Sequence, residues 1–202
     1  MVTVLAIDTS QGACSAALLE GDVVRAHAFE VLGRGHAERL VPMVQDVMAA
    51  AGRGFSDLDL IGVTVGPGTF TGVRIGLAAA RGFALAQGLP VAGVTSTEVV
   101  AEAVALAPEG DDLPPRLAVI HDARRGEVYI QLFERDDPEA PPHPSGDPEV
   151  VGCEHVTEYL PAGALAVAGT GVGLVGAAIA AANPEAVILT GFEYPDARYV
   201  AR

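Results

Sequence analysis

A carboxylate stands at the end of the first strongly β-forming segment of the chain. Val2 to Ile7 is a nearly continuous apolar run, and Asp8, Thr9 and Ser10 follow it directly. Proteins of the α/β class bind ligands at the carboxyl ends of strands, so these three residues could hold a metal–phosphate group. A turn that only caps the strand, held by the Asp, Thr or Ser side chain, is an equally good interpretation.

Two glycine-rich segments, at 66–72 and 169–173, each lie between a predicted strand and a predicted helix. Glycine lets a backbone approach a ligand closely, and a helix N-terminus favours an anion. The first segment lacks the lysine of the nucleotide-binding phosphate loop, and the second is a non-specific Gly-x-Gly-x-Gly pattern. Close packing of helix on sheet is the alternative explanation. The candidates for a vestigial phosphate site are Asp8, Thr9, Ser10, Gly66, Gly68, Gly72, Gly169 and Gly171.

Neither histidine nor cysteine forms a pattern typical of a metal site. The five histidines show no paired spacing on one helix, so we expect each to be a surface or cap residue. Cys14 and Cys153 lie far apart in the sequence, which is typical of reduced thiols. We therefore expect no metal. The histidines are His27, His36, His121, His143 and His155.

The composition describes an acidic protein of 202 residues with a formal net charge of −14 and no lysine. Phosphate contacts need a basic face, so this charge argues against free-standing binding of nucleic acid. The apolar start of the chain, Met1–Ile7, has no positively charged leader and is followed directly by Asp8. It is therefore too short for a signal or membrane segment. These features predict a cytoplasmic protein that does not enter a membrane.

Hydrophobic periodicity predicts an α/β fold built from two similar halves. A meander of three strands at 2–7, 13–19 and 23–29 precedes an amphipathic helix at 36–51 and alternating strands and helices. The segment 108–115, rich in proline and acid, is a predicted linker, so we expect an N-terminal half at 1–107 and a C-terminal half at 108–202. A second acidic, proline-rich stretch at 136–148 predicts a surface loop.

Four motifs, in this order and spacing, resemble the TsaB (YeaZ) family over nearly the whole chain. They are Asp8–Ser10, Gly35–Met43, Gly66–Gly76 and Asp122–Tyr129, of which the last two are the specific ones. Members of this family are accessory subunits of the bacterial complex that makes threonylcarbamoyladenosine on tRNA. The resemblance implies an actin/Hsp70-like (ASKHA) fold with duplicated ribonuclease-H-like halves. It also implies a helix and short tail after the position of Arg202, which this chain would lack.

The partners implied by the resemblance are a TsaD-like catalytic paralogue and a TsaE-like ATPase. Alone, the chain would form a homodimer, and it would meet tRNA only indirectly. No cofactor of its own is implied, with ATP or ADP a candidate in the assembled complex. The paralogue carries a metal-binding pair of histidines at positions that correspond here to Ser96 and Val100. Because valine has no ligand atom and serine is a poor ligand, we expect a pseudo-enzyme subunit.

The predicted partner surface consists of the helix at 36–51 and the small-residue helix at 73–87, which could pack against the same helices of a copy or a paralogue. An equally good interpretation is that these residues face their own sheet. An ATP-binding phosphotransferase or ATPase that uses Asp8 and both glycine segments is the alternative function. A metalloprotease is disfavoured by the missing histidine pair. The predicted interface residues are His36, Leu40, Met43, Val47, Gly72, Ile75, Gly76 and Ala79.

Overall fold

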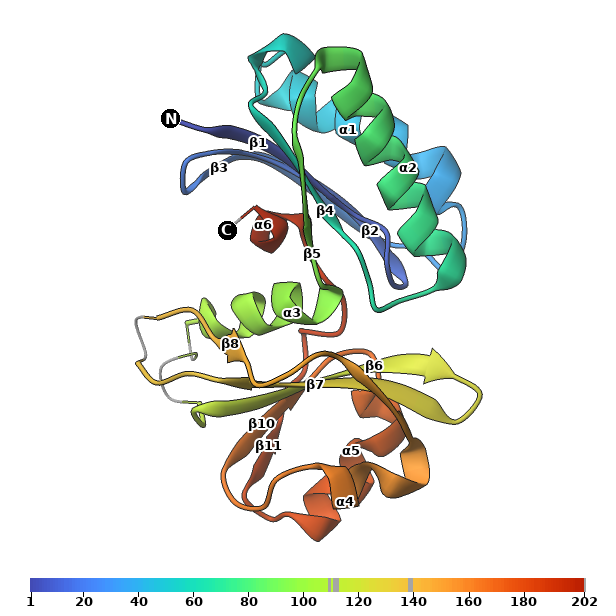
Figure 1. The fold of residues 1–202 in the computed structure, drawn as a ribbon, viewed down its shortest axis with the longest axis vertical. Coiled ribbons are helices and arrows are strands. Elements are labelled where there is room, and N and C mark those ends of the chain that lie inside the picture. Colours follow the sequence, from blue (N-terminus) through green and yellow to red (C-terminus); the bar gives the residue numbers. More distant parts are fainter. Residues whose placement is uncertain (109, 111–112, 138–139, 202) are drawn as a thin grey trace. The chain divides into compact units, whose positions relative to one another are not determined.

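The computed structural model describes residues 1–108, 110, 113–137 and 140–201 (Figure 1). Its contacts divide the chain into a first unit, Met1–Val99 with the segment from Pro195 onward, and a second unit, Val100–Tyr194. This division lies eight residues before the predicted boundary at 107/108, and the last segment returns to the first unit instead of ending the second. Residues 109, 111 and 112 of the predicted linker and 138 and 139 of the predicted loop lie outside the described residues.

The first unit contains a five-stranded sheet in the order β3-β2-β1-β4-β5. The meander pairs antiparallel, with Asp8 opposite Ser15, whereas β4 and β5 run parallel to β1. The early strands therefore form the predicted meander. The strands are β1 (Thr3–Asp8), β2 (Ala13–Glu20), β3 (Val23–Val31), β4 (Leu60–Thr64) and β5 (Val91–Val94).

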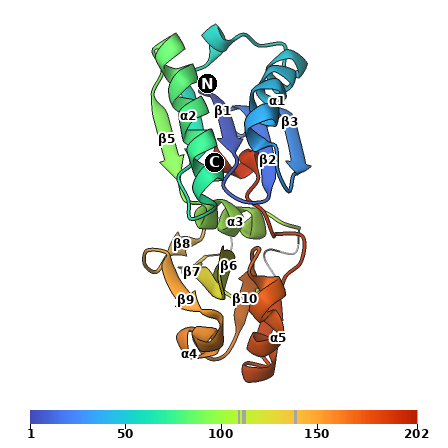
Figure 2. The ribbon, with the colours of Figure 1, turned by 90° about the vertical axis from the view of Figure 1, so that its right-hand side faces the viewer.

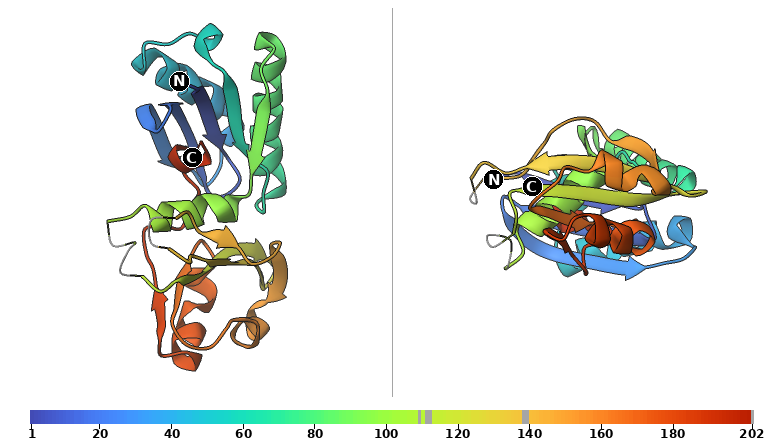
Figure 3. Two further views of the ribbon diagram at one scale, coloured as in Figure 1. Left: turned by 60° about the vertical axis from the view of Figure 1, so that its left-hand side comes forward. Right: turned by 90° about the horizontal axis from the view of Figure 1, so that it is seen from below.

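Helices α1 (His36–Ala50) and α2 (Phe70–Gln87) cover one face of this sheet and lie side by side (Figure 2). The short helix α6 (Ala197–Val200) packs on the opposite face (Figure 3). Alternation along β1 explains the two layers, because Leu5 and Ile7 point to α1 while Ala6 points to α6. A turn of 3₁₀ helix, η1 (Phe55–Asp57), joins α1 to β4.

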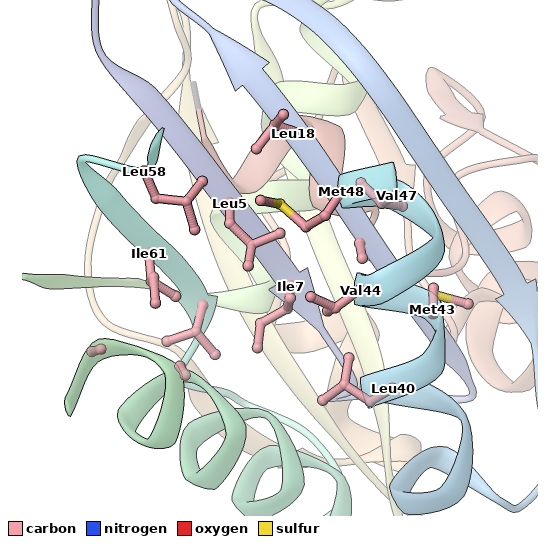
Figure 4. Packing of buried hydrophobic residues seen from close by; sticks show 14 of the residues in the cluster. Leu5, Ile7, Leu18, Leu40, Met43, Val44, Val47, Met48, Leu58 and Ile61 are labelled. Atoms are coloured by element: carbon pink, nitrogen blue, oxygen red, sulfur yellow. The ribbon is translucent and has the colours of Figure 1, made fainter. Parts of the chain in front are cut away.

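The apolar stripe of α1 is the centre of the first unit's core (Figure 4). Leu40, Met43 and Val47 are at most 2% exposed and pack on the sheet. Their prediction as direct partner contacts is therefore wrong, because the three- and four-residue spacing that suggested an interface is the spacing of the helix face buried in its own unit. The labelled core residues are Leu5, Ile7, Leu18, Leu40, Met43, Val44, Val47, Met48, Leu58 and Ile61.

Helix α3 (Ser96–Ala105) begins with the predicted capping box. The Thr95 hydroxyl accepts a hydrogen bond from the Glu98 amide at 3.1 Å, and the Glu98 carboxylate accepts one from the Thr95 amide at 2.7 Å. Two otherwise unpaired amides at the start of the helix are satisfied in this way. The division between the two units falls inside this helix, after Val99.

The second unit contains a six-stranded sheet in the order β11-β10-β6-β7-β8, with β9 also paired to β7. Its connections are η3 (Cys153–His155), α4 (Val156–Tyr159) and α5 (Val172–Ala182). Part of the predicted 136–148 loop is strand β8. The strands are β6 (Arg116–Arg124), β7 (Glu127–Glu134), β8 (His143–Pro144), β9 (Glu149–Gly152), β10 (Leu165–Ala168) and β11 (Ala186–Ile188).

The two units repeat one arrangement of elements. In each, an antiparallel hairpin (β1–β2 or β6–β7) lies beside a parallel strand (β4 or β10) that leads through a glycine-rich turn into a helix (α2 or α5). The strand order 3-2-1-4-5 of the first unit is that of a ribonuclease-H-like half. The predicted fold class, two duplicated halves of this kind, is confirmed.

Candidate functional site

The strand end of the first unit holds a fully buried carboxylate, Asp8. Its Oδ1 atom accepts hydrogen bonds from the Ser10 amide at 3.1 Å, the Ser10 hydroxyl at 2.6 Å and the Thr64 hydroxyl at 2.5 Å. Its Oδ2 atom is buried with no hydrogen-bond partner among the described residues. One carboxylate oxygen thus accepts three hydrogen bonds, and the other accepts none from the described residues.

Burial raises the pKa of Asp8 to about 6, although the hydrogen bonds from Ser10 and Thr64 lower it in part. The nearby charge of Asp196 adds a smaller upward effect on this pKa. A carboxyl group in this position exchanges its proton close to neutral pH, whereas an exposed aspartate does so near pH 4.

The glycine-rich segment 66–72 lies directly on the turn that follows β1. A Cβ atom added to Gly68 would overlap the carbonyl oxygen of Ser10, and one added to Gly72 would overlap that of Thr9. One at Gly76 would stand 2.9 Å from the Thr9 hydroxyl. These glycines therefore permit close packing of α2 on the chain's own backbone, which was the alternative explanation for them.

Hydrogen bonds close this contact. The Thr69 amide donates to the Ser10 carbonyl at 2.8 Å, and the Thr9 hydroxyl donates to the Gly72 carbonyl at 2.8 Å. The Gly72 amide donates to the Thr69 hydroxyl, which caps α2 three residues earlier than the sequence predicted. The structure brings together the six candidate residues of the first unit, whose phosphate-binding role stays a prediction.

Two further polar residues fix the far side of this loop: Gln11, which the sequence analysis did not name, and Ser96, which it named only as a position where the paralogue has a histidine. The Ser96 hydroxyl donates to the Pro67 carbonyl at 2.5 Å, and the Gln11 amide group donates to the same oxygen at 3.1 Å. The Ser96 amide also donates to the Gly66 carbonyl at 2.8 Å. The one signal in the sequence was their position, because Gln11 follows the Asp-Thr-Ser turn and Ser96 begins a helix.

The second unit repeats the close approach of glycine to a strand end. Added Cβ atoms at Gly169 and Gly171 would overlap Ile120, and Gly169 has a φ of 107°, in the region that favours glycine. The Thr170 hydroxyl accepts a hydrogen bond from the Asp122 amide at 2.9 Å and lies 3.3 Å from Nδ1 of His121. His121 is fully buried, so its prediction as a surface or cap residue is wrong.

A second buried carboxylate, Asp196, holds the returning segment against the first unit's sheet. Oδ1 of Asp196 lies 2.9 Å from Nε2 of His27, and Oδ2 lies 2.8 Å from the Arg198 guanidinium. Burial raises the pKa of Asp196, but the hydrogen bonds from His27 and Arg198 outweigh it and hold the pKa below its usual value. The Ala197 amide donates to the Ser15 hydroxyl beside this ion pair at 2.9 Å.

The other predicted interface residues also point mostly inward. Gly72 and Gly76 face Thr9. Ile75 and Ala79 are half-buried against the core. His36 is also half-buried. The exposed side of α2 is a different stripe, at four- and three-residue intervals, in which Phe70 is 73% and Leu85 87% exposed. The stripe consists of Phe70, Arg74, Ala78, Arg81 and Leu85.

The Arg74 guanidinium stacks 3.3 Å from the centre of the Phe70 ring and donates to the Phe70 carbonyl. Such a pair fixes an exposed aromatic side chain at the start of the helix. Elsewhere, no three His, Cys, Asp or Glu side chains of the described residues form a cluster that could hold a metal ion. Within the same residues, every helix is too short or too polar to cross a bilayer.

Comparison with known proteins points to one group of relatives. Residues 30–140 match the family described as "TsaD: tRNA N6-adenosine threonylcarbamoyltransferase". The tRNA threonylcarbamoyladenosine biosynthesis protein TsaB of Escherichia coli is 42% identical over 134 residues, which are 66% of this chain and 56% of that protein. The TsaB protein of Bacillus subtilis is 37% identical over 133 residues, 66% of this chain and 56% of that protein. The matched part thus spans little more than half the length of these curated relatives.

The structural relatives agree. A protein from Pseudomonas aeruginosa, described as similar to peptidase YeaZ, has a crystal structure that superposes on this chain with a TM-score of 0.84. The two sequences are 34% identical. The superposition covers all of this chain and 89% of that protein. The similarity therefore extends over both units.

Proposed function

The chain belongs to the TsaB (YeaZ) family, and from this premise we propose that it is a non-catalytic subunit in the threonylcarbamoyladenosine modification of tRNA. In this role it binds and supports a catalytic subunit of the TsaD type, its paralogue. A TsaE-like ATPase joins the complex, tRNA is met through these partners, and the chain alone forms a homodimer. The cytoplasm is the compartment that this role requires.

The observation that carries the proposal is the closed strand end of the first unit. A loop that binds phosphate offers free amide groups and open space above its glycines. Here the amides of Thr69 and Gly72 donate to the chain's own oxygens, and the space above Gly68 and Gly72 is filled by the backbone of Thr9 and Ser10. This geometry favours a structural use of the motif over catalysis.

The two positions where the paralogue carries its metal-binding histidines support the same conclusion. Ser96 is buried and its hydroxyl is engaged by the Pro67 carbonyl. Val100 is fully buried in an apolar cluster of the second unit with Ala101 and Val104. Both side chains serve packing or loop position, and neither supplies a ligand that a metal would prefer.

We place the partner contact on the exposed stripe of α2 defined above and on Val41, which is exposed on the neighbouring helix α1. Large apolar side chains that point to water, anchored by an aromatic–arginine pair, are typical of protein interfaces. This replaces the predicted contacts at Leu40, Met43 and Val47 by the outward residues of the same two helices.

The test is the affinity of the purified chain for the TsaD-type paralogue from the same genome, measured by calorimetry. Leu85→Glu should weaken binding at least about tenfold, because it places a charge in an apolar contact. Leu174→Glu, at a residue of α5 that is 56% exposed, is the matched control and should bind normally. A wild-type chain that does not bind the paralogue, or modification of tRNA that proceeds at full rate without the chain, would contradict the proposal.

One observation favours the alternative function, an ATP-binding phosphotransferase or ATPase. The bare Oδ2 atom of Asp8 is an unused acceptor at the strand end where such proteins hold a metal–phosphate group. Under this alternative the isolated chain binds Mg-ATP, and Asp8→Ala abolishes that binding. If calorimetry measures the same binding of Mg-ATP by the wild type and by Asp8→Ala, the alternative is eliminated.

A further inference from the structure

The β6–β7 hairpin carries two arginines in a backbone conformation that disfavours them. Arg124 has a φ of 72° and Arg125 a φ of 57°, and among the described residues no other non-glycine residue has a positive φ. Left-handed backbone is costly for side chains with a Cβ atom, and hairpin turns of this kind normally use Asn, Asp or Gly. Two successive arginines therefore sacrifice folding stability at this turn.

Neighbouring contacts hold this conformation in place. The Asp122 carboxylate accepts a hydrogen bond from the Arg124 amide at 2.7 Å and pairs with the Arg124 guanidinium at 3.0 Å. The Asp122 amide is itself fixed by the Thr170 hydroxyl, and the Gly126 carbonyl accepts from the Cys153 amide at 2.8 Å. The tip is thus tied to its own unit on both sides.

The two guanidinium groups are nevertheless presented to solvent. The side chain of Arg124 is 74% exposed despite its ion pair. Arg125 is exposed and makes no ion pair with any described residue. Strain that persists at an exposed turn is a sign of function, because selection for stability alone would replace these residues.

From this combination we infer that the hairpin tip, Arg124–Arg125, contacts a carboxylate on a protein partner, with Arg125 as the contacting residue and Arg124 as its support. The guanidinium group matches a carboxylate in a two-pronged hydrogen-bonded pair. The inference rests on the proposed function, because it takes the TsaD-type subunit to be the bearer of that carboxylate.

Charge decides between a carboxylate and a nucleic acid. Asp122 and Glu127 stand next to the two arginines, Glu127 directly opposite Arg124 in the hairpin, so the tip has no net positive charge. The whole chain carries −14. A polyanion would be repelled by these surroundings, whereas a single carboxylate needs only one free guanidinium.

The experiment compares Arg125→Asn with Arg34→Asn, which changes an exposed arginine of the first unit in the same way. Asparagine suits the turn, so Arg125→Asn should raise the unfolding midpoint of the isolated chain by roughly 2–4 °C. The same variant should weaken binding to the TsaD-type subunit about five- to tenfold at low salt, and its affinity should depend less on salt than that of the wild type. Arg34→Asn should bind like the wild type.

The outcomes separate the two proposals. A wild-type complex whose affinity is unchanged by Arg125→Asn overturns the hairpin contact and leaves the proposed function in place. Absence of the wild-type complex overturns both. A variant that binds the subunit normally but lowers the affinity of the complex for tRNA would assign the tip to RNA phosphate and overturn the carboxylate.

Discussion

The strand ends of the two units use the same packing and different chemistry. In the first unit, Gly68 and Gly72 lie against the carbonyls of Ser10 and Thr9. In the second, Gly169 and Gly171 lie against Ile120. A glycine turn that presses a helix onto the neighbouring strand is thus present in both units.

The buried titratable group beside each turn is what differs. It is the carboxyl of Asp8 in the first unit and the imidazole of His121 in the second, and each lies next to a threonine hydroxyl, of Thr64 or Thr170. The duplication therefore preserved the steric requirement of the turn and not a particular acid or base. Glycine at these positions is explained by packing in both units, whether or not either site ever held a phosphate.

The largest expected effect is that of Gly72→Ala in the first unit. The new methyl group overlaps the Thr9 carbonyl, so either α2 or the strand end must shift, and we expect a loss of about 3 kcal/mol in the free energy of unfolding. Urea denaturation measures the loss, and amide hydrogen exchange should show it as faster opening of β1 and β4.

The matched control is Gly82→Ala in the same helix, where an added methyl meets nothing within 4 Å. It should stabilise the chain by up to about 1 kcal/mol, because alanine is the better helix former. Gly169→Ala should destabilise as Gly72→Ala does, but with faster exchange in β6 and β10. If Gly72→Ala is as stable as Gly82→Ala, the shared packing requirement is refuted.

Asp8→Asn should change the pH dependence of stability. A carboxyl whose pKa is raised from 3.8 to about 6 disfavours folding above pH 6, and this penalty fades as the pH falls from 6 towards 3.8. The stability advantage of Asp8→Asn over the wild type should therefore shrink by about 1 to 1.5 kcal/mol between pH 7.5 and pH 5. Thermal unfolding at both pH values measures it, and a constant difference would argue against a raised pKa.

The smallest expected effect is that of Thr170→Val in the second unit. It removes the acceptor of the Asp122 amide and should cost about 1 kcal/mol in the free energy of unfolding. Thr64→Val is the corresponding change beside Asp8, and it should raise the pKa of that carboxyl further because its hydrogen bond lowers it. A Thr64→Val variant with the same pH dependence of stability as the wild type would argue against this effect on Asp8.

Local patterns predicted most of the fold. The meander, the capping box at Thr95 and Glu98 and the helix at 36–50 follow from periodicity and cap chemistry that act within a few residues. The start of α2 was placed three residues late because the cap at Thr69 was not recognised. Apolar periodicity also cannot distinguish a face buried in its own sheet from one buried by a partner, which is why Met43 and Val47 were misassigned.

The site was predicted in part for the same reason. Strand ends and glycine turns are visible locally, so Asp8 and the loop at 66–72 could be identified as neighbours in an α/β fold. Three features depend on contacts between distant parts of the chain. They are the packing of the glycines in the 66–72 loop against the chain's own backbone, the burial of His121 and the pairing of Asp196 with His27. No short-range signal in the sequence carries that information.

The return of the chain at Pro195 has a consequence for how the protein is made. Helix α6 covers Ala6, Ala17 and Leu19, which belong to the earliest strands. A ribosome delivers those strands first and α6 only after all of the second unit. During translation one face of the sheet in the nascent first unit therefore lacks the cover of α6 until residues 197–200 have been synthesised.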